Sequence, residues 1–343
     1  MQKELNYNYV YFNSNCGKKW ELDPDEYNAV CLRDLTKLNN VTVVQCILGH
    51  LPLFLRILCA IHNSQRINNH LNLPFKRIWY PFYFKKNKKR DKPYCFIVSG
   101  TNLSMDYLKY LRHKYPDSKF VKIHRDLMKI THENPEYSEE NMNKLFDLRL
   151  TYDEGEAEKY GILSFDEIES KVEIPVDKDY PLCDVFFAGK AKDRFQKIIK
   201  AYDIFETAGL KCDFFITGVP KDKQIIRAGI VYSDVFMPYK EMLYKSVNAR
   251  CMLDINQEGA IGYTSRFLEA IIYNKKLIAN NPSMLCSKYY NPKFIQFVEK
   301  MEDINPSFVT DECLVDYHYE GDFSPINLIL QIDNELSKAN GKG

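Results

Sequence analysis

Apolar and polar positions along the chain alternate between short runs typical of buried strands and longer patterns typical of amphipathic helices. In the first half, strands are predicted at Val41–Ile47, Tyr94–Gly100, Lys119–Asp126 and Leu145–Asp153. Helices follow these runs: one begins after Ser104 as its N-cap, and another ends at Gly161. This series predicts parallel β/α units.

The alternation stops at Glu169–Asp184, a stretch with prolines and acidic residues that is typical of a linker. After it, strands are predicted at Asp184–Lys190, Cys212–Gly218, Arg250–Asn256 and Lys275–Asn280. Together the two series predict an α/β fold with two Rossmann-like β/α/β domains, 1–178 and 179–343, facing across a cleft. The last helix, at about 324–340, could pack back on the N-terminal domain.

Composition narrows the class of protein. Of 343 residues, 45% are hydrophobic and 27% charged, which is typical of a soluble globular protein, and the net charge of +1 predicts no general attraction to nucleic acid. The ten cysteines form no CxxC pair, which argues against a zinc ribbon and favours a reducing compartment. We expect no secretory signal and no membrane-spanning helix, because the apolar window Val41–His62 is interrupted by Pro52 and Arg56.

A first candidate for anion binding is the sequence FFAGKAKDR, Phe186–Arg194. A strand ends at Gly189 and a helix begins near Arg194, so free backbone N–H groups and the positive end of the helix dipole could face an anion. Lys190 and Arg194 would add charge-assisted contacts to a diphosphate. The P-loop pattern is absent, and an ordinary strand-to-helix turn with solvated lysines is the alternative.

A second candidate is EGAIGYTSRFLEAIIYNKKLIANN, Glu258–Asn281, in which a glycine-rich loop leads into a helix that begins at Tyr263–Ser265. Arg266 and Glu269 lie three residues apart and therefore share one face of that helix. They form an ordinary ion pair in one interpretation, and bind a phosphate and a ribose in the other. The apolar residues around them leave little solvated face, which favours a position near a pocket.

The order of these segments resembles a known family. It runs from a strand, Gly, Lys and Arg through FMPY, Phe236–Tyr239, to a glycine-rich loop followed by Arg-x-x-Glu-Ala and KKLI. This order is similar to the nucleotide-binding half of GT-B glycosyltransferases, specifically those of bacterial polysaccharide and lipopolysaccharide synthesis. The resemblance extends from about Lys119 to Asp303. It implies a C-terminal domain that binds a nucleotide-sugar donor and an N-terminal domain that holds the acceptor.

The resemblance also implies roles for individual residues. Glu269 would bind the donor ribose, and the FMPY segment would border the base. The implied donor-binding residues are Gly189, Lys190, Arg194, Tyr239, Tyr263, Thr264, Ser265, Arg266 and Glu269. One departure concerns stereochemistry: the Glu-x7-Glu arrangement of retaining members needs a glutamate at Ile261, and the nearest is Glu258. Retention or inversion of the sugar configuration therefore stays open.

A general base is expected from the N-terminal domain, where KIHRDL places Asp126 and His124 at a strand end. Asp126 is the first choice, with helix N-capping as its alternative, and His124 is the second, with a structural role as its alternative. No DxD pair follows a strand, so we expect neither a metal nor a cofactor beyond the nucleotide-diphosphate sugar. Lysine, arginine and helix dipoles would then stabilise the leaving diphosphate.

A basic cluster interleaved with aromatic residues lies at Lys76–Lys92. It suits an anionic membrane surface or a lipid-diphosphate acceptor, and single-stranded nucleic acid would use the same residue types. A solvated loop is the alternative. The charged residues at its centre are Lys85, Lys86, Lys88, Lys89 and Arg90.

The leading hypothesis is a glycosyltransferase that moves a hexose-type sugar from a nucleotide sugar to a lipid-linked surface polysaccharide or lipopolysaccharide, as in capsule or exopolysaccharide synthesis in bacteria. The expected location is the cytoplasm, with peripheral contact at the inner face of the plasma membrane as an option, and no nucleic-acid partner is expected. The alternatives are a nucleotide-sugar epimerase, a non-catalytic nucleotide-sugar-binding protein and, more remotely, a single-stranded nucleic-acid binder.

Overall fold

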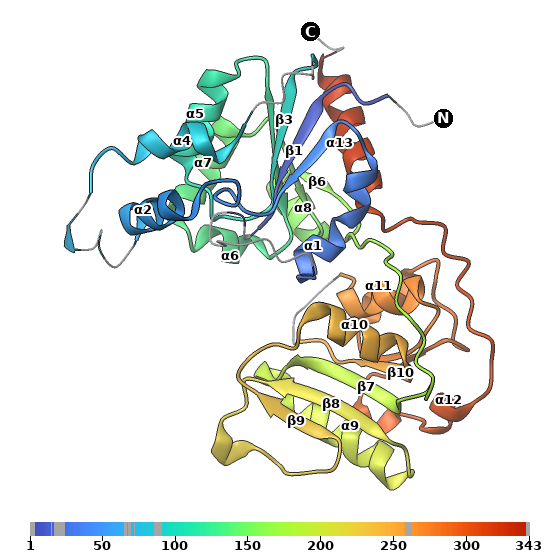
Figure 1. Ribbon diagram of the computed structural model, residues 1–343. Coiled ribbons are helices and arrows are strands. Elements are labelled where there is room, and N and C mark those ends of the chain that lie inside the picture. The colour runs from blue at the N-terminus through green and yellow to red at the C-terminus, as the bar shows by residue number, and fades with distance from the viewer. Residues whose placement is uncertain are drawn as a thin grey trace. The chain divides into compact units, whose positions relative to one another are not determined.

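The computed structural model describes residues 4–14, 16, 25–64, 67, 70–71, 73–85, 91–257 and 262–340. The chain forms two compact units (Figure 1). Unit 1 comprises the described residues of 1–24, 31–168 and 325–343, and unit 2 those of 25–30 and 169–324. The main part of the second unit thus begins at Glu169, at the start of the segment that the sequence assigns to a linker, and the helix at the C-terminus belongs to unit 1.

Unit 1 is built on a parallel sheet that has six strands in the described part of the chain, in the order β2-β1-β3-β4-β5-β6. The strands are β1 Asn8–Phe12, β2 Val41–Val44, β3 Tyr94–Val98, β4 Lys119–His124, β5 Leu148–Thr151 and β6 Leu163–Ser164. The helices are η1 Arg33–Lys37, α2 Leu53–Asn63, η2 Lys76–Trp79, α4 Tyr80–Tyr83, α5 Met105–Lys114, α6 Met128–His132, η3 Pro135–Tyr137, α7 Glu139–Leu145, α8 Glu154–Tyr160 and α13 Pro325–Asn340. A short helix, α1 Tyr27–Cys31, lies where the chain passes between the units.

The two faces of the first sheet are covered by different helices. Alternate residues of the strands, such as Phe96 and Phe120, pack with α5 and α7 on one face. The other face, which includes Tyr9 and Ile123, packs against apolar residues of α13. Asp333 fixes this helix, because it accepts hydrogen bonds from the Tyr9 hydroxyl at 2.7 Å and from the Asn6 amide nitrogen at 2.8 Å. Figure 1 shows α13 alongside β1.

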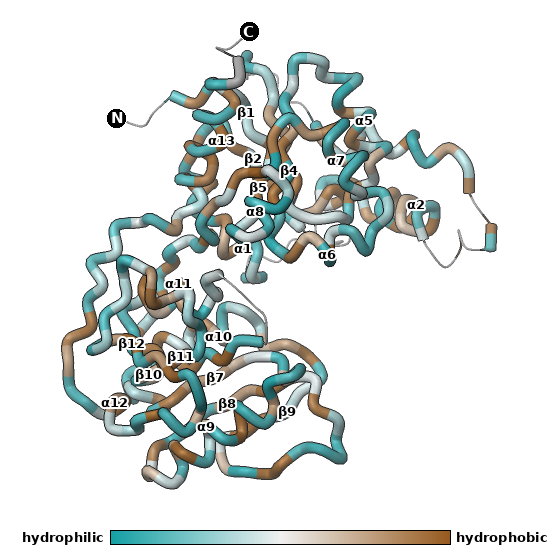
Figure 2. Tube along the Cα trace, turned by 180° about the vertical axis from the view of Figure 1, so that it is seen from behind, coloured by the Kyte–Doolittle hydropathy of each residue, from teal (hydrophilic) through white to brown (hydrophobic). Residues whose placement is uncertain are grey.

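Unit 2 repeats the plan with a parallel sheet in the order β12-β11-β10-β7-β8-β9, again six strands among the described residues. The strands are β7 Cys183–Lys190, β8 Cys212–Thr217, β9 Ile230–Ser233, β10 Ala249–Asp254, β11 Lys276–Ala279 and β12 Ile295–Phe297. The helices are η4 Lys192–Arg194, α9 Phe195–Thr207, η5 Lys221–Lys223, α10 Tyr239–Val247, α11 Ser265–Ile272, η6 Pro282–Cys286, η7 Met301–Asp303 and α12 Ser307–Thr310. Residues of α9 cover one face, and residues of α10 and α11 cover the other. Figure 2 shows that the strands carry much of the hydrophobic colour in both units.

The sequence patterns predict the α/β fold and its alternation of strands and helices, and the structure confirms both. Some predicted bounds are wrong: β2 ends at Val44, and α7 takes the first residue of the strand predicted at Leu145–Asp153. Four strands were missed, β1, β6, β9 and β12, which are short and in part rich in polar residues or tyrosine, so that no clear apolar run identifies them. Among the described residues, no helix is both long and apolar enough to cross a membrane.

Candidate functional site

The carboxyl ends of β7 and β10 lie side by side at the centre of the second sheet. From these two strands the chain winds outward in opposite directions, through β8 and β9 on one side and through β11 and β12 on the other. This reversal is a topological switch point, the place where open α/β sheets bind ligands, just beyond the carboxyl ends of the strands. The first segment that the sequence singles out for donor binding contains the end of β7, and the second follows β10 in the chain.

Arg194 joins the ends of these two strands. Its Nε donates to the Lys190 carbonyl at 3.1 Å, and its Nη1 donates to the Ile255 carbonyl. A Cβ on Gly189 would come within 3.0 Å of Arg194 Nη2 and 3.2 Å of Phe187 Cζ. Glycine at position 189 is therefore what allows the guanidinium to fold back over the strand end. Burial lowers the pKa of Arg194, but a guanidinium keeps its charge at neutral pH.

Asp254, the last residue of β10, organises the start of α11. It is buried and accepts a hydrogen bond from the Thr264 hydroxyl, and Thr264 is the N-cap of α11, accepting from the Phe267 amide at 3.2 Å. Burial raises the pKa of the Asp254 carboxyl, whereas the Thr264 hydrogen bond and the charges of Arg194 and Arg266 lower it. The charges of both predicted phosphate-binding arginines thus act on the carboxylate that is hydrogen-bonded to the N-cap of α11.

Arg266 and Glu269 form an ion pair, but on a buried face of α11. The Glu269 side chain has no exposed surface and that of Arg266 is 17% exposed. Glu269 Oε2 accepts from Arg266 Nη1, and Oε1 accepts from the Tyr239 hydroxyl at 2.9 Å. Tyr239 also lies 3.2 Å from Oε1 of the buried Glu169. The two charges thus bind each other, and they do so on a face of the helix that is largely withdrawn from solvent.

The remaining predicted donor residues lie around this centre. The Ser265 hydroxyl is 3.0 Å from the Tyr27 hydroxyl, and the Tyr27 ring packs edge-on against Tyr239 with centroids 5.0 Å apart. Tyr263 stacks on Phe267 with centroids 4.7 Å apart. Lys190 is exposed, and the methylene groups of its side chain lie beside Gly218, where a Cβ would meet them at 3.2 Å. Glu258 and Ile261, on which the question of stereochemistry depends, lie outside the described residues.

Sequence reasoning missed three residues of this site: Asp254, Glu169 and Tyr27. Asp254 stands at the end of an apolar run, MLDIN, and this position could have identified it. Glu169 and Tyr27 are distant in the sequence from the segments that they contact, and no local pattern connects them.

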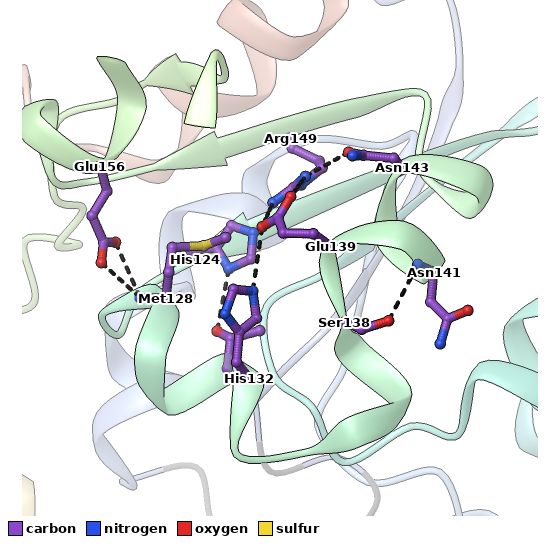
Figure 3. Close-up of polar contacts among 10 residues, drawn as sticks. His124, Met128, His132, Ser138, Glu139, Asn141, Asn143, Arg149 and Glu156 are labelled. Atoms are coloured by element: carbon purple, nitrogen blue, oxygen red, sulfur yellow. Dashed lines mark hydrogen bonds and ion pairs between the residues drawn. The ribbon is translucent and has the colours of Figure 1, made fainter. Parts of the chain in front are cut away.

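In unit 1, His124 is buried. The side chain is 1% exposed at the end of β4, and its Nδ1 lies 3.3 Å from the Thr131 hydroxyl (Figure 3). Its Nε2 has no hydrogen-bond partner among the described residues. Burial, together with the charges of Lys122, Arg149 and His132, lowers the pKa of His124 to about 2. The imidazole is therefore neutral at physiological pH.

Charged neighbours of His124 form their own network. Arg149 Nη1 and Nη2 donate to the two carboxylate oxygens of Glu139 at 2.7 and 2.8 Å, and His132 Nε2 is 3.3 Å from Oε1 of the same carboxylate. Lys122 lies two residues before His124 on β4 and is also buried. Its Nζ donates to the carbonyls of Ser99 at 3.2 Å and Ile123 at 3.0 Å. Burial lowers the pKa of Lys122 to about 7.

Asp126 is exposed just beyond the end of β4. The alternative role considered for it, an N-cap, is wrong: Leu127 is the N-cap of α6, and Glu156 accepts from the first helical amide, that of Met128, at 2.9 and 3.1 Å. The exposed carboxylate thus has no capping function. Of the basic cluster, Lys85 is exposed, whereas Lys86, Lys88, Lys89 and Arg90 lie outside the described residues. No group of metal-binding side chains occurs in the part of the chain that is described.

The fold of this protein is similar to that of several solved structures. No protein-family model matches the chain, and no well-characterised protein matches it by sequence. Among solved structures, the chain is similar to an alpha-glucosyltransferase in complex with UDP-glucose and DNA containing an abasic site, with 11% identity, a TM-score of 0.54, and coverage of 95% of this chain and 98% of that one. It is also similar to a trehalose-6-phosphate synthase, with 9% identity, a TM-score of 0.52 and coverage of 96% and 95%.

A trehalose 6-phosphate synthase from Burkholderia multivorans matches with 9% identity, a TM-score of 0.50 and coverage of 98% of each chain. At these identities the likeness concerns the backbone. This protein has two Rossmann-like units, each built on a parallel sheet. The matches cover nearly the whole of this chain and of each matched chain. The protein therefore has the GT-B glycosyltransferase fold.

Proposed function

We propose that the protein is a glycosyltransferase whose donor is a nucleotide-diphosphate sugar bound by unit 2. The observation that carries the proposal is the position of Arg194 at the switch point: it donates to the carbonyl of Ile255, next to Asp254, whose carboxylate is hydrogen-bonded to Thr264. It holds a permanent cation beside the N-terminus of an eight-residue helix, α11. Cations and helix N-termini are the groups that bind phosphates in proteins.

Several donors in this region are available to a diphosphate. Among the described residues, Arg194 Nη2, Lys190 Nζ and the first-turn amides of Ser265 and Arg266 have no hydrogen-bond acceptor. The first N–H groups of any helix lack an intrahelical partner. The likeness to an alpha-glucosyltransferase crystallised with UDP-glucose supports a nucleotide sugar as the source of that diphosphate.

In this proposal Glu269 binds the ribose after an exchange of partners. Its two oxygens are taken by Arg266 and Tyr239, and the side chain has no exposed surface. The ribose hydroxyls would replace the Tyr239 hydroxyl on Oε1, which turns an internal hydrogen bond into a ligand contact. The ion pair to Arg266 would stay, holding the carboxylate in place.

For catalysis we place the general base on Asp126 rather than on His124. Asp126 is exposed and accessible to an acceptor hydroxyl. His124 is buried, and with a pKa near 2 it would be a weak base. Lys190, Arg194 and the α11 N-terminus would stabilise the charge that develops on the departing diphosphate. The acceptor in this proposal is a lipid-linked surface glycan held by unit 1.

The test is saturable binding of UDP-, GDP- and dTDP-sugars, followed by transfer of radiolabelled sugar to a lipid extract. Lys190→Ala should weaken binding of the preferred nucleotide roughly tenfold, the usual effect of one charge-assisted contact. Lys197→Ala, which removes an equally exposed lysine from α9, should leave it unchanged.

If the protein bound none of the three nucleotide classes, a nucleotide-sugar donor would be ruled out. Binding with a change in the sugar but no transfer would indicate an epimerase, and binding without any turnover a non-catalytic protein. Double-stranded DNA should be included as an acceptor, because one matched structure contains DNA. Transfer to DNA alone would contradict the lipid-linked acceptor.

A further inference from the structure

Helix α2 carries a row of large apolar side chains on its outer face. Five residues are substantially exposed: Leu53 65%, Phe54 62%, Ile57 43%, Leu58 51% and Ile61 49%. Their spacing of one, three, one and three residues places them on one side of an α-helix. Soluble proteins commonly expose single apolar residues, but a contiguous row of this kind marks an interaction site.

The row belongs to a helix that is firmly held on its opposite face. Cys59 is 1% exposed within the core of unit 1, and its sulfur lies 3.6 Å from the Tyr83 hydroxyl. The Trp79 indole donates to His62 Nδ1 at 3.0 Å, which ties the end of α2 to η2. Figures 1 and 2 both show α2 at the periphery of unit 1. The exposed row is thus a feature of a packed helix.

The segment that follows α2 adds to the same apolar surface. Phe75 is 78% exposed, Ile78 56% and Phe82 45%, and they lie in or next to η2 and α4. Contacts between α2 and η2 bring the two parts together. We call the five residues of α2 and these three the apolar face.

The charge of the surrounding sequence is strongly one-sided. Residues 35–90 contain no Asp or Glu and ten Lys or Arg, whereas the remaining residues contain 37 Lys or Arg and 46 Asp or Glu. A chain with a net charge of +1 therefore concentrates its positive charge in the segment that carries the apolar face. Of the described cations in this segment, Lys37 pairs with Asp34 and Arg77 with Asp106, and Lys85 is exposed. An apolar helical face in an acid-free, basic stretch of sequence fits the interface of a membrane that contains anionic lipid.

We propose that the apolar face is a membrane-docking surface, with α2 lying in the plane of an anionic lipid bilayer. A second copy of the chain fits less well, because a two-fold contact would bring two acid-free basic segments together. Nucleic acid also fits less well, because leucine and isoleucine neither stack on bases nor bind phosphate. The inference deepens the proposed function, since it names the surface at which a lipid-linked acceptor would be met.

The experiment measures binding of the full chain to vesicles by flotation. We expect binding to phosphatidylcholine vesicles that contain about 30 mol% phosphatidylglycerol, and binding at least roughly tenfold weaker to phosphatidylcholine alone. Phe54→Gln combined with Leu58→Gln should weaken binding to the anionic vesicles roughly tenfold or more, because two inserted side chains are lost. The matched control is Ile226→Gln with Val235→Gln, which removes apolar side chains that are 92% and 72% exposed in unit 2.

Three results would overturn the proposal. Vesicle binding that the α2 double variant leaves unchanged would move the surface elsewhere. A dimer that dissociates in this variant, without vesicle binding, would make the apolar face an interface between copies. Salt-sensitive binding to single-stranded DNA, again without vesicle binding, would assign the segment to nucleic acid. Nucleotide binding is measured in parallel, so that failure of membrane docking and failure of the donor site are recorded separately.

Discussion

The two sheets of this protein share a fold plan but carry different charges at their carboxyl ends. Near the carboxyl ends of β7 and β10 in unit 2, the cations are two arginines, and each has a carboxylate near it: Arg266 pairs with Glu269, and Asp254 acts on both Arg194 and Arg266. In unit 1, Lys122 and His124 are buried against carbonyl and hydroxyl groups at the end of β4, with Asp126 acting on Lys122 and Glu139 paired with the neighbouring Arg149. The difference lies in the chemistry of the side chains and of their partners.

The cations of the unit 2 site keep their charge at all physiological pH values, whereas the charges of Lys122 and His124 in unit 1 depend on pH. Burial lowers the pKa of Lys122 to about 7 and of His124 to about 2, so both can give up their protons near or below neutral pH. Burial lowers the arginine pKa values as well, but from a starting value so high that the charge is kept. The two arginines of unit 2 therefore keep their positive charge over a wide pH range.

The largest effect is expected from breaking the buried pair in unit 2. Arg266→Met leaves the fully buried Glu269 without its cation, which should lower the free energy of unfolding by about 3–5 kcal/mol. Arg266→Met combined with Glu269→Met should cost less than the single change, because no uncompensated charge remains. Urea denaturation measures both.

The matched control is Lys144→Met, which breaks the exposed pair with Glu140, whose side chains are 70% and 77% exposed. That change should leave stability almost unchanged, because exposed ion pairs contribute little. If Arg266→Met were no more destabilising than Lys144→Met, the pair at Glu269 would not be buried as described.

The next effect concerns Lys122 and the pH dependence of stability. Between pH 7 and the ordinary lysine pKa of 10.5, the unfolded chain binds a proton that the folded chain releases. This group's contribution therefore rises with pH in that window, by up to about 1.4 kcal/mol per pH unit, and is lost as the pH falls toward 7. Lys122→Met should remove this rise, as measured by urea denaturation at several pH values from 7 to 10.

The exposed lysine Lys129 supplies the comparison. Lys129→Met should keep the pH profile of the wild-type protein. A profile of Lys122→Met parallel to the wild type would mean that Lys122 keeps its proton when the chain folds.

A smaller effect is expected at Gly189. Gly189→Ala would place a Cβ 3.0 Å from Arg194 Nη2, so that the guanidinium would have to shift by a few tenths of an ångström. Affinity for the nucleotide, measured by calorimetry, should fall roughly tenfold, the effect of weakening one charge-assisted contact. Gly155→Ala, in the first turn of α8 in unit 1, should leave the affinity unchanged. Equal affinities for the two variants would indicate that Arg194 does not contact the donor.

The smallest effect is expected at Tyr239. Tyr239→Phe removes the hydroxyl that occupies Glu269 Oε1, so a ribose no longer has to displace it. We expect nucleotide affinity to rise by roughly threefold, within the range of one net hydrogen bond. The control ligand is a 2′,3′-dideoxynucleotide, which should gain nothing from the change. A gain of the same size for both ligands would contradict the exchange of partners at Glu269.

Local pattern predicted most of the elements and the positions of the candidate residues along them. The glycine of FFAGKAKDR, the hydroxyl residues that begin α11 and the shared face of Arg266 and Glu269 follow from turn chemistry, capping and helical periodicity. These properties depend on residues a few positions apart. For that reason a single sequence was enough to identify them.

Tertiary structure decided what those residues contact. The sequence placed Arg266 and Glu269 on one face, but only the packing of α10 and α11 on the second sheet buries Glu269 and brings Tyr239 to it. Similarly, the sequence offered Asp126 as the first and His124 as the second candidate base, and only the fold shows that His124 is buried and Asp126 exposed. Burial and the partners of a charge are set by segments that meet only when the chain folds, and they determine which charges can act on a ligand.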